Sequence, residues 1–352
     1  MASELPIQPM PSVTVVMSPR ERFSLTQRSI ESLFTDLSVP FDFICVDGGS
    51  PASVRDYLRR EAARRDFRLL RTEHYLTPNE ARNLAIEQVR TRYVVFIDND
   101  LIVAPGWLRH LLRCAEETSA DIVAPLICIG EPVHARVHMA GGEARFTEEN
   151  GRRMFRESHR FANRGVAEVR DKLVRGPCEL AEFHCLLTRK SVLDRLGPLD
   201  ENLKTLSEHT DFCLAVRRDG GTVMFEPNAI VTYVVGPRMV LSDIPFFYYR
   251  WSDEWSIDSE RYFHEKWGTV FSDSISRGFV AEHRRLVWPC LRRIVQALLG
   301  WTVSEFLFEH LMMLMIWWAR RRQERLRTDH RQTASMAARV SRNSLKPNGE
   351  AS

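Results

Sequence analysis

The feature that most constrains this chain is an apolar run that ends in two carboxylates. Residues 93–97 read YVVFI, and Asp98, Asn99 and Asp100 follow directly. Such a run predicts a strand buried on both faces, as in a parallel sheet. Because residues two apart in a strand project to the same side, Asp98 and Asp100 would point together from its carboxyl end, where open α/β sheets bind ligands. Carboxylate oxygens suit Mg²⁺ or Mn²⁺, ions that hold diphosphates, although an isolated D-x-D is more often a solvated turn.

The first 125 residues alternate between strand-like and helix-like patterns. Strands are expected at residues 13–17, 43–46, 68–70, 93–97 and 122–124. Helices are expected between them at about 25–35, 52–65, 78–89 and 105–117. This alternation predicts right-handed βαβ crossovers and an α/β fold with a doubly wound, mostly parallel sheet. Residues 131–177 lack a regular pattern and are interpreted as an excursion over the sheet edge.

Charge and cysteine content limit the class of protein. Residues 281–352 carry 13 Lys and Arg against 6 Asp and Glu, so the whole-chain charge of +3 leaves −4 for residues 1–280. The basic excess therefore lies away from the D-x-D motif, which argues against nucleic-acid binding. Seven cysteines without a C-x-x-C pattern predict reduced thiols, and the polar start of the chain lacks the pattern of a signal peptide. We therefore expect a cytoplasmic protein.

The segment 286–318 has a broad apolar helical face, but two glutamates and a histidine interrupt it, and their burial in a bilayer would be costly. A transmembrane span is therefore not expected. Two interpretations remain open. One is a helical hairpin packed on the domain or in a dimer. The other is a peripheral contact of residues 286–322 with the inner face of the membrane, with Trp317 and Trp318 near the headgroups and the following arginines on anionic lipid.

Two further motifs could bind a nucleotide. Asp47 ends the second expected strand and is followed by two glycines, so it could accept a hydrogen bond from the ring N–H of a uracil-type base. It could equally be a turn residue that caps the next helix. Arg82 and Asn83 lie one turn into the helix opened by Thr77-Pro78, where a guanidinium could meet a nucleotide and an amide could orient it. Surface helices also carry arginine routinely.

A fourth motif opens the amphipathic helix expected at 208–219. Glu208, His209 and Asp211 lie in its first turn. An imidazole with a near-neutral pKa is suited to act as a general base. Alternatively, the cluster could serve only to cap and stabilise the helix.

In this order the four motifs resemble inverting glycosyltransferases of family 2, which have the GT-A fold. Residues 185–190 and the run LGPLDE at 196–201 extend the resemblance, which closes near KWG at 266–268. It implies a GT-A domain with a C-terminal helical extension. The expected organisation is a flexible N-terminus at 1–11, a GT-A domain at 12–268 with a nucleotide-binding half at 12–125 and an acceptor half at 126–268, a helical extension at 269–327 and a disordered tail at 328–352.

The resemblance implies single-displacement transfer of a sugar from a nucleoside diphosphate sugar, with UDP-sugars favoured, to a glycan, lipid-linked or small-molecule acceptor. A Mn²⁺ or Mg²⁺ ion on Asp98 and Asp100 would offset charge on the leaving diphosphate. The implied donor-binding residues are Pro19, Arg20, Asp47, Arg82, Asn83, Asp98 and Asn99. The catalytic residues would be His209 as base, with Glu208 and Asp211 in support. The acceptor side would include Glu182 and His184, with Trp251 and Trp255 as a sugar-stacking wall or, alternatively, as core residues.

This chain departs from the family pattern at two positions. His209 stands where relatives have an aspartate base, so the base is His209 or a neighbouring carboxylate. Tyr233 stands where many relatives have a metal-binding histidine, so the third ligand would be His184, His138 or water.

Two rival functions follow from these departures and from the first strand. A sugar nucleotidyltransferase would need a glycine-rich loop after that strand, and residues 18–22, SPRER, contain no glycine. A catalytically silent binding or assembly protein would tolerate the histidine at the base position.

Overall fold

The computed structural model describes residues 11–235 and 239–344, with side chains as far as residue 329. The strands are β1 Val13–Ser18, β2 Asp42–Gly48, β3 Arg68–Thr72, β4 Tyr93–Asp98, β5 Leu101–Val103, β6 Ile122–Ile129, β7 Val137–Ala140, β8 Gly142–Glu149, β9 Arg152–His159, β10 Gly176–Pro177, β11 Cys185–Arg189 and β12 Val223–Tyr233. The α-helices are α1 Thr26–Leu33, α2 Ala52–Arg65, α3 Pro78–Ile86, α4 Trp107–Thr118, α5 Val166–Val169, α6 Lys190–Leu196, α7 Glu208–Arg218, α8 Ile244–Arg250, α9 Asp253–Trp267, α10 Asp273–Arg284, α11 Pro289–Leu299 and α12 Trp301–Ser344.

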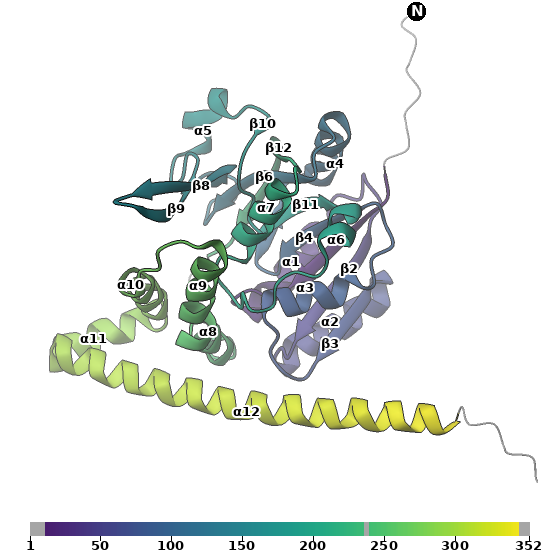
Figure 1. Ribbon diagram of the computed structural model, residues 1–352. Helices are drawn as coiled ribbons and strands as arrows, with labels where there is room; N and C mark the ends of the chain where they lie inside the picture. The colour runs from purple at the N-terminus through teal and green to yellow at the C-terminus, as the bar shows by residue number, and fades with distance from the viewer. Residues whose placement is uncertain (1–10, 236–238, 345–352) are drawn as a thin grey trace, which may run out of the picture.

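The predicted α/β sheet is present, with helices on both faces (Figure 1). Its strand order is β10-β12-β6-β11-β4-β1-β2-β3, with β5 on β12 and β7 on β6. Strands β4, β1, β2 and β3 are parallel, whereas β11 runs antiparallel to both of its neighbours. Because Ser18 at the end of β1 lies opposite Asp98 at the end of β4, the carboxyl ends of these strands form one edge. The sequence therefore predicted correctly the edge that carries the D-x-D motif.

Local sequence explains the elements beside that edge. All six residues of β4 are buried, as its unbroken apolar run requires. Helix α3 begins with a capping box, in which the Thr77 hydroxyl accepts from the backbone N–H of Glu80 and the Glu80 carboxylate accepts from the backbone N–H of Thr77. Pro78 occupies the first helical position, where its missing N–H costs nothing. The start of α3 is thereby fixed at the sheet edge.

The interpretation of residues 131–177 as irregular is wrong. Strands β8 and β9 form a two-stranded antiparallel sheet that projects beside α9 and α10 (Figure 1). Its turn is Asn150-Gly151, where both residues have positive φ, of 53° and 71°. An Asn-Gly pair favours this two-residue hairpin turn because both residues tolerate the left-handed region. The hairpin brings the end of β9 back toward the main sheet.

The C-terminal helices share hydrophobic clusters with the domain, so they are not a detached extension. Trp251 lies in a cluster with residues from α8, α10 and α12, and Trp255 lies in another with Phe23 and Tyr75. Both tryptophans are buried, so the stacking-wall interpretation is wrong and the core alternative holds. Their large apolar surfaces are removed from water between packed helices.

Helix α12 crosses from α11 past α8 to the loop after β3 (Figure 1). There the buried Gln323 side chain accepts a hydrogen bond from the backbone N–H of Tyr75, and Arg327 pairs with Glu80 at 3.1 Å. The chain is helical as far as Ser344, whereas the sequence predicted a disordered tail from residue 328 onward. The predicted flexible N-terminus and the last eight residues lie outside the described segments, apart from Pro11.

No helix among the described residues is apolar over a sufficient length to span a membrane. All seven cysteines are free, and all but Cys290 are buried.

Candidate active site

Asp98 lies at the centre of a buried charge cluster at the end of β4. One carboxylate oxygen, Oδ2, is 3.2 Å from Nη1 of Arg20 and 3.2 Å from Nδ1 of His184. The other, Oδ1, is 3.4 Å from Nη2 of Arg82. Burial raises the pKa of Asp98, but His184 and the two guanidiniums together lower it by more, so the pKa of Asp98 is about 2. Asp98 is therefore an anion at neutral pH.

Asp100 and His184 complete a set of donors suited to a divalent metal ion. Ligand atoms of Asp98, Asp100 and His184 all lie within 4.8 Å of one another, and all three residues are buried. Oδ1 of Asp100 is buried without a hydrogen-bond partner, and burial together with the charge of Asp98 raises the pKa of Asp100. Burial and the nearby Arg20 lower the pKa of His184 to about 4, so its imidazole is neutral and has a lone pair to donate. This orphaned oxygen beside a neutral imidazole fits a metal ligand set.

Tyr233 supports His184 and lies outside that ligand set. Its ring packs against the His184 imidazole with centroids 4.6 Å apart, and its hydroxyl donates to Glu21 at 3.1 Å. Glu21 in turn faces the buried guanidinium of Arg250 at 3.7 Å. His184 lies in the loop before β11, and Tyr233 is the last residue of β12, so the two rings come from different elements. Of the alternatives for the third ligand, the geometry favours His184; His138 lies in a separate group described below. Glu21 and Arg250 were not predicted, because no local sequence pattern distinguishes them from surface charges.

The loop after β1 is held in place by Asn99. Its carbonyl oxygen accepts from the backbone N–H of Arg20 at 2.9 Å, and its amide donates to the carbonyl of Arg22 and the hydroxyl of Thr26. Every polar atom of the Asn99 side chain is thereby engaged, so Asn99 positions Arg20 next to Asp98. Pro19, Asp47 and Asn99 line one small pocket between β1, β2 and β4. The structure thus brings three of the predicted donor residues together.

Asp47 acts as a turn residue, which was the alternative to a role in binding a nucleotide base. Its carboxylate accepts from the backbone N–H and the hydroxyl of Ser50, both at 2.9 Å, and pairs with Arg71. A carboxylate has about four acceptor positions, so about one remains for a ligand. Gly49 continues this turn with a φ of +72°, and a Cβ there would lie 3.0 Å from the backbone of His74. The turn therefore needs glycine at this position.

Arg82 and Asn83 have different roles. Arg82 is buried, donates to Asn79 at 3.1 Å, and lies between Asp98 and Glu208, whose Oε1 is 3.9 Å from Nη1. It therefore links β4 to the start of α7. Asn83 instead donates to the carbonyl of Leu199 and accepts from its backbone N–H, both at 2.9 Å. Its amide is committed to the loop after α6, which corrects its predicted contact with a nucleotide.

The first turn of α7 separates its three predicted catalytic residues. Asp211 accepts from Trp267 Nε1 and Lys266 Nζ, both at 2.9 Å, so it anchors α7 to the end of α9. Glu208 is buried against Arg82. His209 is the most accessible of the three, with 18% of its side chain exposed, and its Nε2 is 3.7 Å from Oε1 of Glu157.

Burial lowers the pKa of His209, but the carboxylates of Glu157, Glu182 and Glu208 together raise it more, and the result is about 9. The near-neutral pKa expected from the sequence is therefore wrong. The largest contribution that raises it comes from a carboxylate near the end of β9, a strand that the sequence did not predict. Asn150-Gly151 was the signal that could have revealed the hairpin. His209 carries a proton at neutral pH in the ligand-free protein.

Replacing Glu157 with Gln is expected to lower the pKa of His209 from about 9 toward the ordinary value of about 6.5, because the imidazolium loses its carboxylate partner. The measurement is an NMR titration of the imidazole resonances in metal-free protein, with the His209 signal assigned from a His209→Gln variant. Glu148→Gln, an exposed change on the same hairpin, is the control. An unchanged titration midpoint in Glu157→Gln would show that Glu157 is not the cause.

Comparisons with known proteins bear on the identity of this chain. The family model described as Glycosyl transferase family 2 matches residues 14–197, so the match ends before α7. The Pre-mycofactocin glycosyltransferase of Mycobacterium tuberculosis (strain CDC 1551 / Oshkosh) is 27% identical over 223 residues, which cover 63% of this chain and 42% of that protein. Uncharacterized protein y4gI of Sinorhizobium fredii (strain NBRC 101917 / NGR234) is 25% identical over 232 residues, 64% of this chain and 24% of that protein. The chain thus spans less than half the length of these relatives.

A solved structure has a similar fold. It is described as the crystal structure of GalNAc-T7 with UDP, GalNAc and Mn2+, and it superposes with a TM-score of 0.51 at 14% sequence identity. The similarity covers 79% of this chain and 55% of that chain. At this level of identity the comparison concerns the fold alone.

Proposed function

The chain belongs to glycosyl transferase family 2 and has the GT-A fold, and on this premise we propose that it transfers a sugar from a nucleoside diphosphate sugar to an acceptor hydroxyl. The observation that carries the proposal is the convergence of Asp98, Asp100 and His184 at the carboxyl edge of the sheet, with an unpartnered buried oxygen on Asp100. Residues 12–268 would form the catalytic domain, with the nucleotide in the 12–125 half and the acceptor in the 126–268 half.

The donor would lie across the ends of β1, β2 and β4. A divalent ion held by Asp98, Asp100 and His184 would offset the charge that develops on the leaving diphosphate. A nitrogen donor beside two carboxylates favours Mn²⁺ over Mg²⁺, which prefers oxygen ligands alone. Arg20 is oriented by Asn99 to the same edge, where its guanidinium could meet a phosphate. The remaining acceptor position of Asp47 suits the ring N–H of uracil, and UDP is the nucleotide named for the solved GT-A structure.

His209 is the base in this proposal. It would take the proton of the acceptor hydroxyl as that oxygen attacks the anomeric carbon from the face opposite the diphosphate, which inverts the configuration. Glu208 is turned toward Arg82, and Asp211 is bonded to Lys266 and Trp267, so His209 is the accessible group in this turn. Only the unprotonated imidazole can accept, so turnover should rise as the pH approaches about 9. Glu182 would lie on the acceptor side.

A thermal-shift panel of nucleotides tests the donor site. We expect UDP with Mn²⁺ to raise the melting temperature by mass action, and to raise it more than UDP alone or than ADP, CDP or GDP with Mn²⁺. No shift with any nucleoside diphosphate under any metal condition would remove the donor site. A shift with nucleoside triphosphates alone would favour the nucleotidyltransferase, and binding of UDP-sugars without turnover would favour the silent protein.

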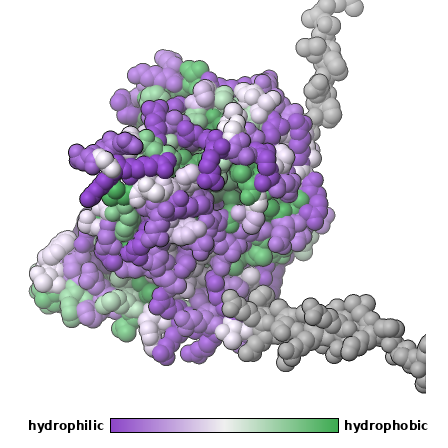
Figure 2. Space-filling model, viewed as in Figure 1, coloured by the Kyte–Doolittle hydropathy of each residue, from purple (hydrophilic) through white to green (hydrophobic). Residues whose placement is uncertain are grey.

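We also propose that α11 and the first half of α12 contact an anionic membrane surface. Figure 2 shows hydrophobic residues gathered at the end of the molecule that these helices form. The exposed apolar side chains include Leu291, Ile294, Leu298, Trp301, Phe306, Leu311, Leu314, Trp317 and Trp318. The Arg321 guanidinium lies 4.3 Å from the centroid of the Trp317 ring, so cationic and aromatic groups share one surface. That combination suits headgroups of anionic lipids.

Replacing both Leu298 and Leu314 with Gln is expected to weaken sedimentation with phosphatidylserine vesicles by at least about tenfold, because both side chains would leave the lipid. They are 76% and 64% exposed, and Val174→Gln, at a site 68% exposed elsewhere on the protein, is the matched control. Full-length protein is used because truncation near residue 278 would remove Met312 and Ala319 from the clusters. Equal vesicle binding by both variants would contradict the contact, and loss of a dimer in sedimentation velocity would favour self-association.

A further inference from the structure

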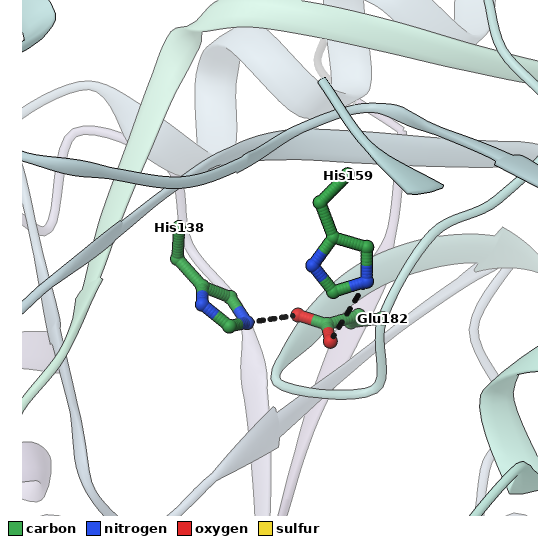
Figure 3. A group of neighbouring side chains, drawn as sticks. All are labelled: His138, His159 and Glu182. Carbon is green, nitrogen blue, oxygen red and sulfur yellow. Dashed lines mark ion pairs between the residues drawn. The ribbon is translucent and has the colours of Figure 1, made fainter. Parts of the chain in front are cut away.

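A second group of metal-ligating side chains lies beside the D-x-D motif. His138 comes from β7, His159 ends β9, and Glu182 lies in the loop before β11. One ligand atom from each lies within 4.8 Å of the other two. Figure 3 shows an imidazole nitrogen of each histidine directed at the Glu182 carboxylate. The His138 and His184 rings are 5.4 Å apart, so this group shares a wall with the D-x-D cluster without using its residues.

The distances suit a single ion. Nε2 of His138 is 3.0 Å from Oε2 of Glu182, and Nε2 of His159 is 3.7 Å from Oε1. With Zn–N and Zn–O bonds of about 2.0–2.2 Å, neighbouring ligand atoms of a tetrahedral site are separated by about 3.3–3.5 Å. The separation to Oε2 is slightly shorter than that range, and the separation to Oε1, the other oxygen of the carboxylate, is slightly longer. Small side-chain rotations would therefore complete the site.

The hydrogen bonding of this group is incomplete. Nε2 of His138 and Oε2 of Glu182 are both buried and lie 3.0 Å apart, but neither atom makes a hydrogen bond. The Glu182 side chain is only 9% exposed, so a carboxylate oxygen there without a hydrogen bond is costly unless a cation meets it. The two histidine side chains are 24% and 22% exposed, so the group lies close to the protein surface. Nε2 of His159 is also 3.1 Å from Oε1 of Glu157, which is placed to act as a fourth ligand or to accept the proton that binding displaces.

From these contacts we propose that His138, His159 and Glu182 form a second divalent-metal site, separate from the D-x-D site. Two imidazoles and one carboxylate suit a borderline transition-metal ion such as Zn²⁺. The three ligands come from three different elements, so the ion would fasten the end of the β8–β9 hairpin to the main sheet. Since β9 also carries Glu157, the partner of His209, the ion would fix the acceptor side of the cleft.

Metal stoichiometry separates the two sites. We expect the wild-type chain to bind two Co²⁺ or Zn²⁺ ions in equilibrium dialysis, and Co²⁺ to produce visible d–d absorption. His138→Gln should bind one ion fewer and lose the absorption of nitrogen-ligated Co²⁺ at this site. Asp100→Asn should lose the other ion and retain that absorption, and the double variant should bind none. His110→Gln, on α4, is the matched control and should bind two.

The outcomes distinguish this site from the donor site. One ion that His138→Gln loses and Asp100→Asn keeps would support the second site even if the D-x-D motif held no metal. Full binding in His138→Gln, or a single ion lost only in Asp100→Asn, would overturn the proposal. His159→Gln provides a second variant if His138→Gln does not fold, as judged by metal-free melting. Zn²⁺ should also raise the melting temperature of wild type and of Asp100→Asn, and should not raise that of His159→Gln/Asp100→Asn.

Discussion

His209→Ala is expected to lower turnover by roughly 10²–10⁴-fold, the usual effect of losing a positioned base, while the affinity for UDP stays near wild type. Turnover and UDP affinity should respond differently because His209 and the donor contacts lie on different elements. His209, at the start of α7, pairs with Glu157, whereas the proposed donor contacts are Asp98 and Asp100 after β4 and Arg20 after β1. The measurements are UDP release from the donor that stabilises the protein most and calorimetric titration with UDP. His110→Ala is the control.

Other substitutions test the same assignment. His209→Asp, which restores the residue found in relatives, should retain part of the activity despite its shorter side chain. Wild-type turnover in His209→Ala would move the base to Glu208 or another carboxylate of the cleft. Loss of UDP binding in His209→Ala would instead make His209 a donor ligand. If Glu157→Gln lowers the pKa of His209, the rise of kcat/KM with pH should move to lower pH in that variant.

Asp100→Ala is expected to abolish the Mn²⁺-dependent part of UDP binding, a loss of at least about 100-fold in affinity. The Oδ1 atom of Asp100 is buried without a partner, and burial and the charge of Asp98 raise the pKa of Asp100. Removing this carboxylate also relieves repulsion with Asp98, so the metal-free variant should melt at or above the wild-type temperature. Calorimetry with UDP, with and without Mn²⁺, measures the first effect, and a metal-free melt measures the second.

Asp258→Ala, an exposed change on α9, is the matched control and should alter neither quantity. An Asp100→Ala protein that melts far below wild type without metal would mean that Asp100 stabilises the fold through contacts other than a metal. Retained Mn²⁺-dependent binding would mean that the ion rests on Asp98 and His184 without Asp100.

The nucleotide-binding half could be predicted from sequence because its signals are local. The buried run of β4, the capping box of α3 and the alternation of strands and helices each depend on neighbouring residues. They fixed the shared strand edge and therefore the D-x-D position. Strand β11 begins at Cys185, so Glu182 and His184 lie in the loop before it, which approaches the same edge.

The acceptor side could not be predicted because its geometry depends on contacts distant in sequence. Glu157 lies close to His209, which is 52 positions further along the chain, and it helps to raise the pKa of that imidazole. The burial of Trp251 and Trp255 depends on α10 and α12, which pack on them from the end of the chain. Asn83 is occupied by the loop at Leu199 for the same reason. Local sequence did predict helix α7, and the Asn150-Gly151 turn was a local signal for the β8–β9 hairpin.

The most direct measurement of the central claim is a crystal structure of the wild-type protein with UDP and Mn²⁺, with data collected at the manganese absorption edge. We expect an anomalous peak among Asp98, Asp100 and His184, with the diphosphate on that ion and the uracil near Asp47. A nucleotide bound elsewhere, or an occupied nucleotide whose diphosphate has no ion beside Asp100, would contradict a metal-dependent donor site at this edge of the sheet.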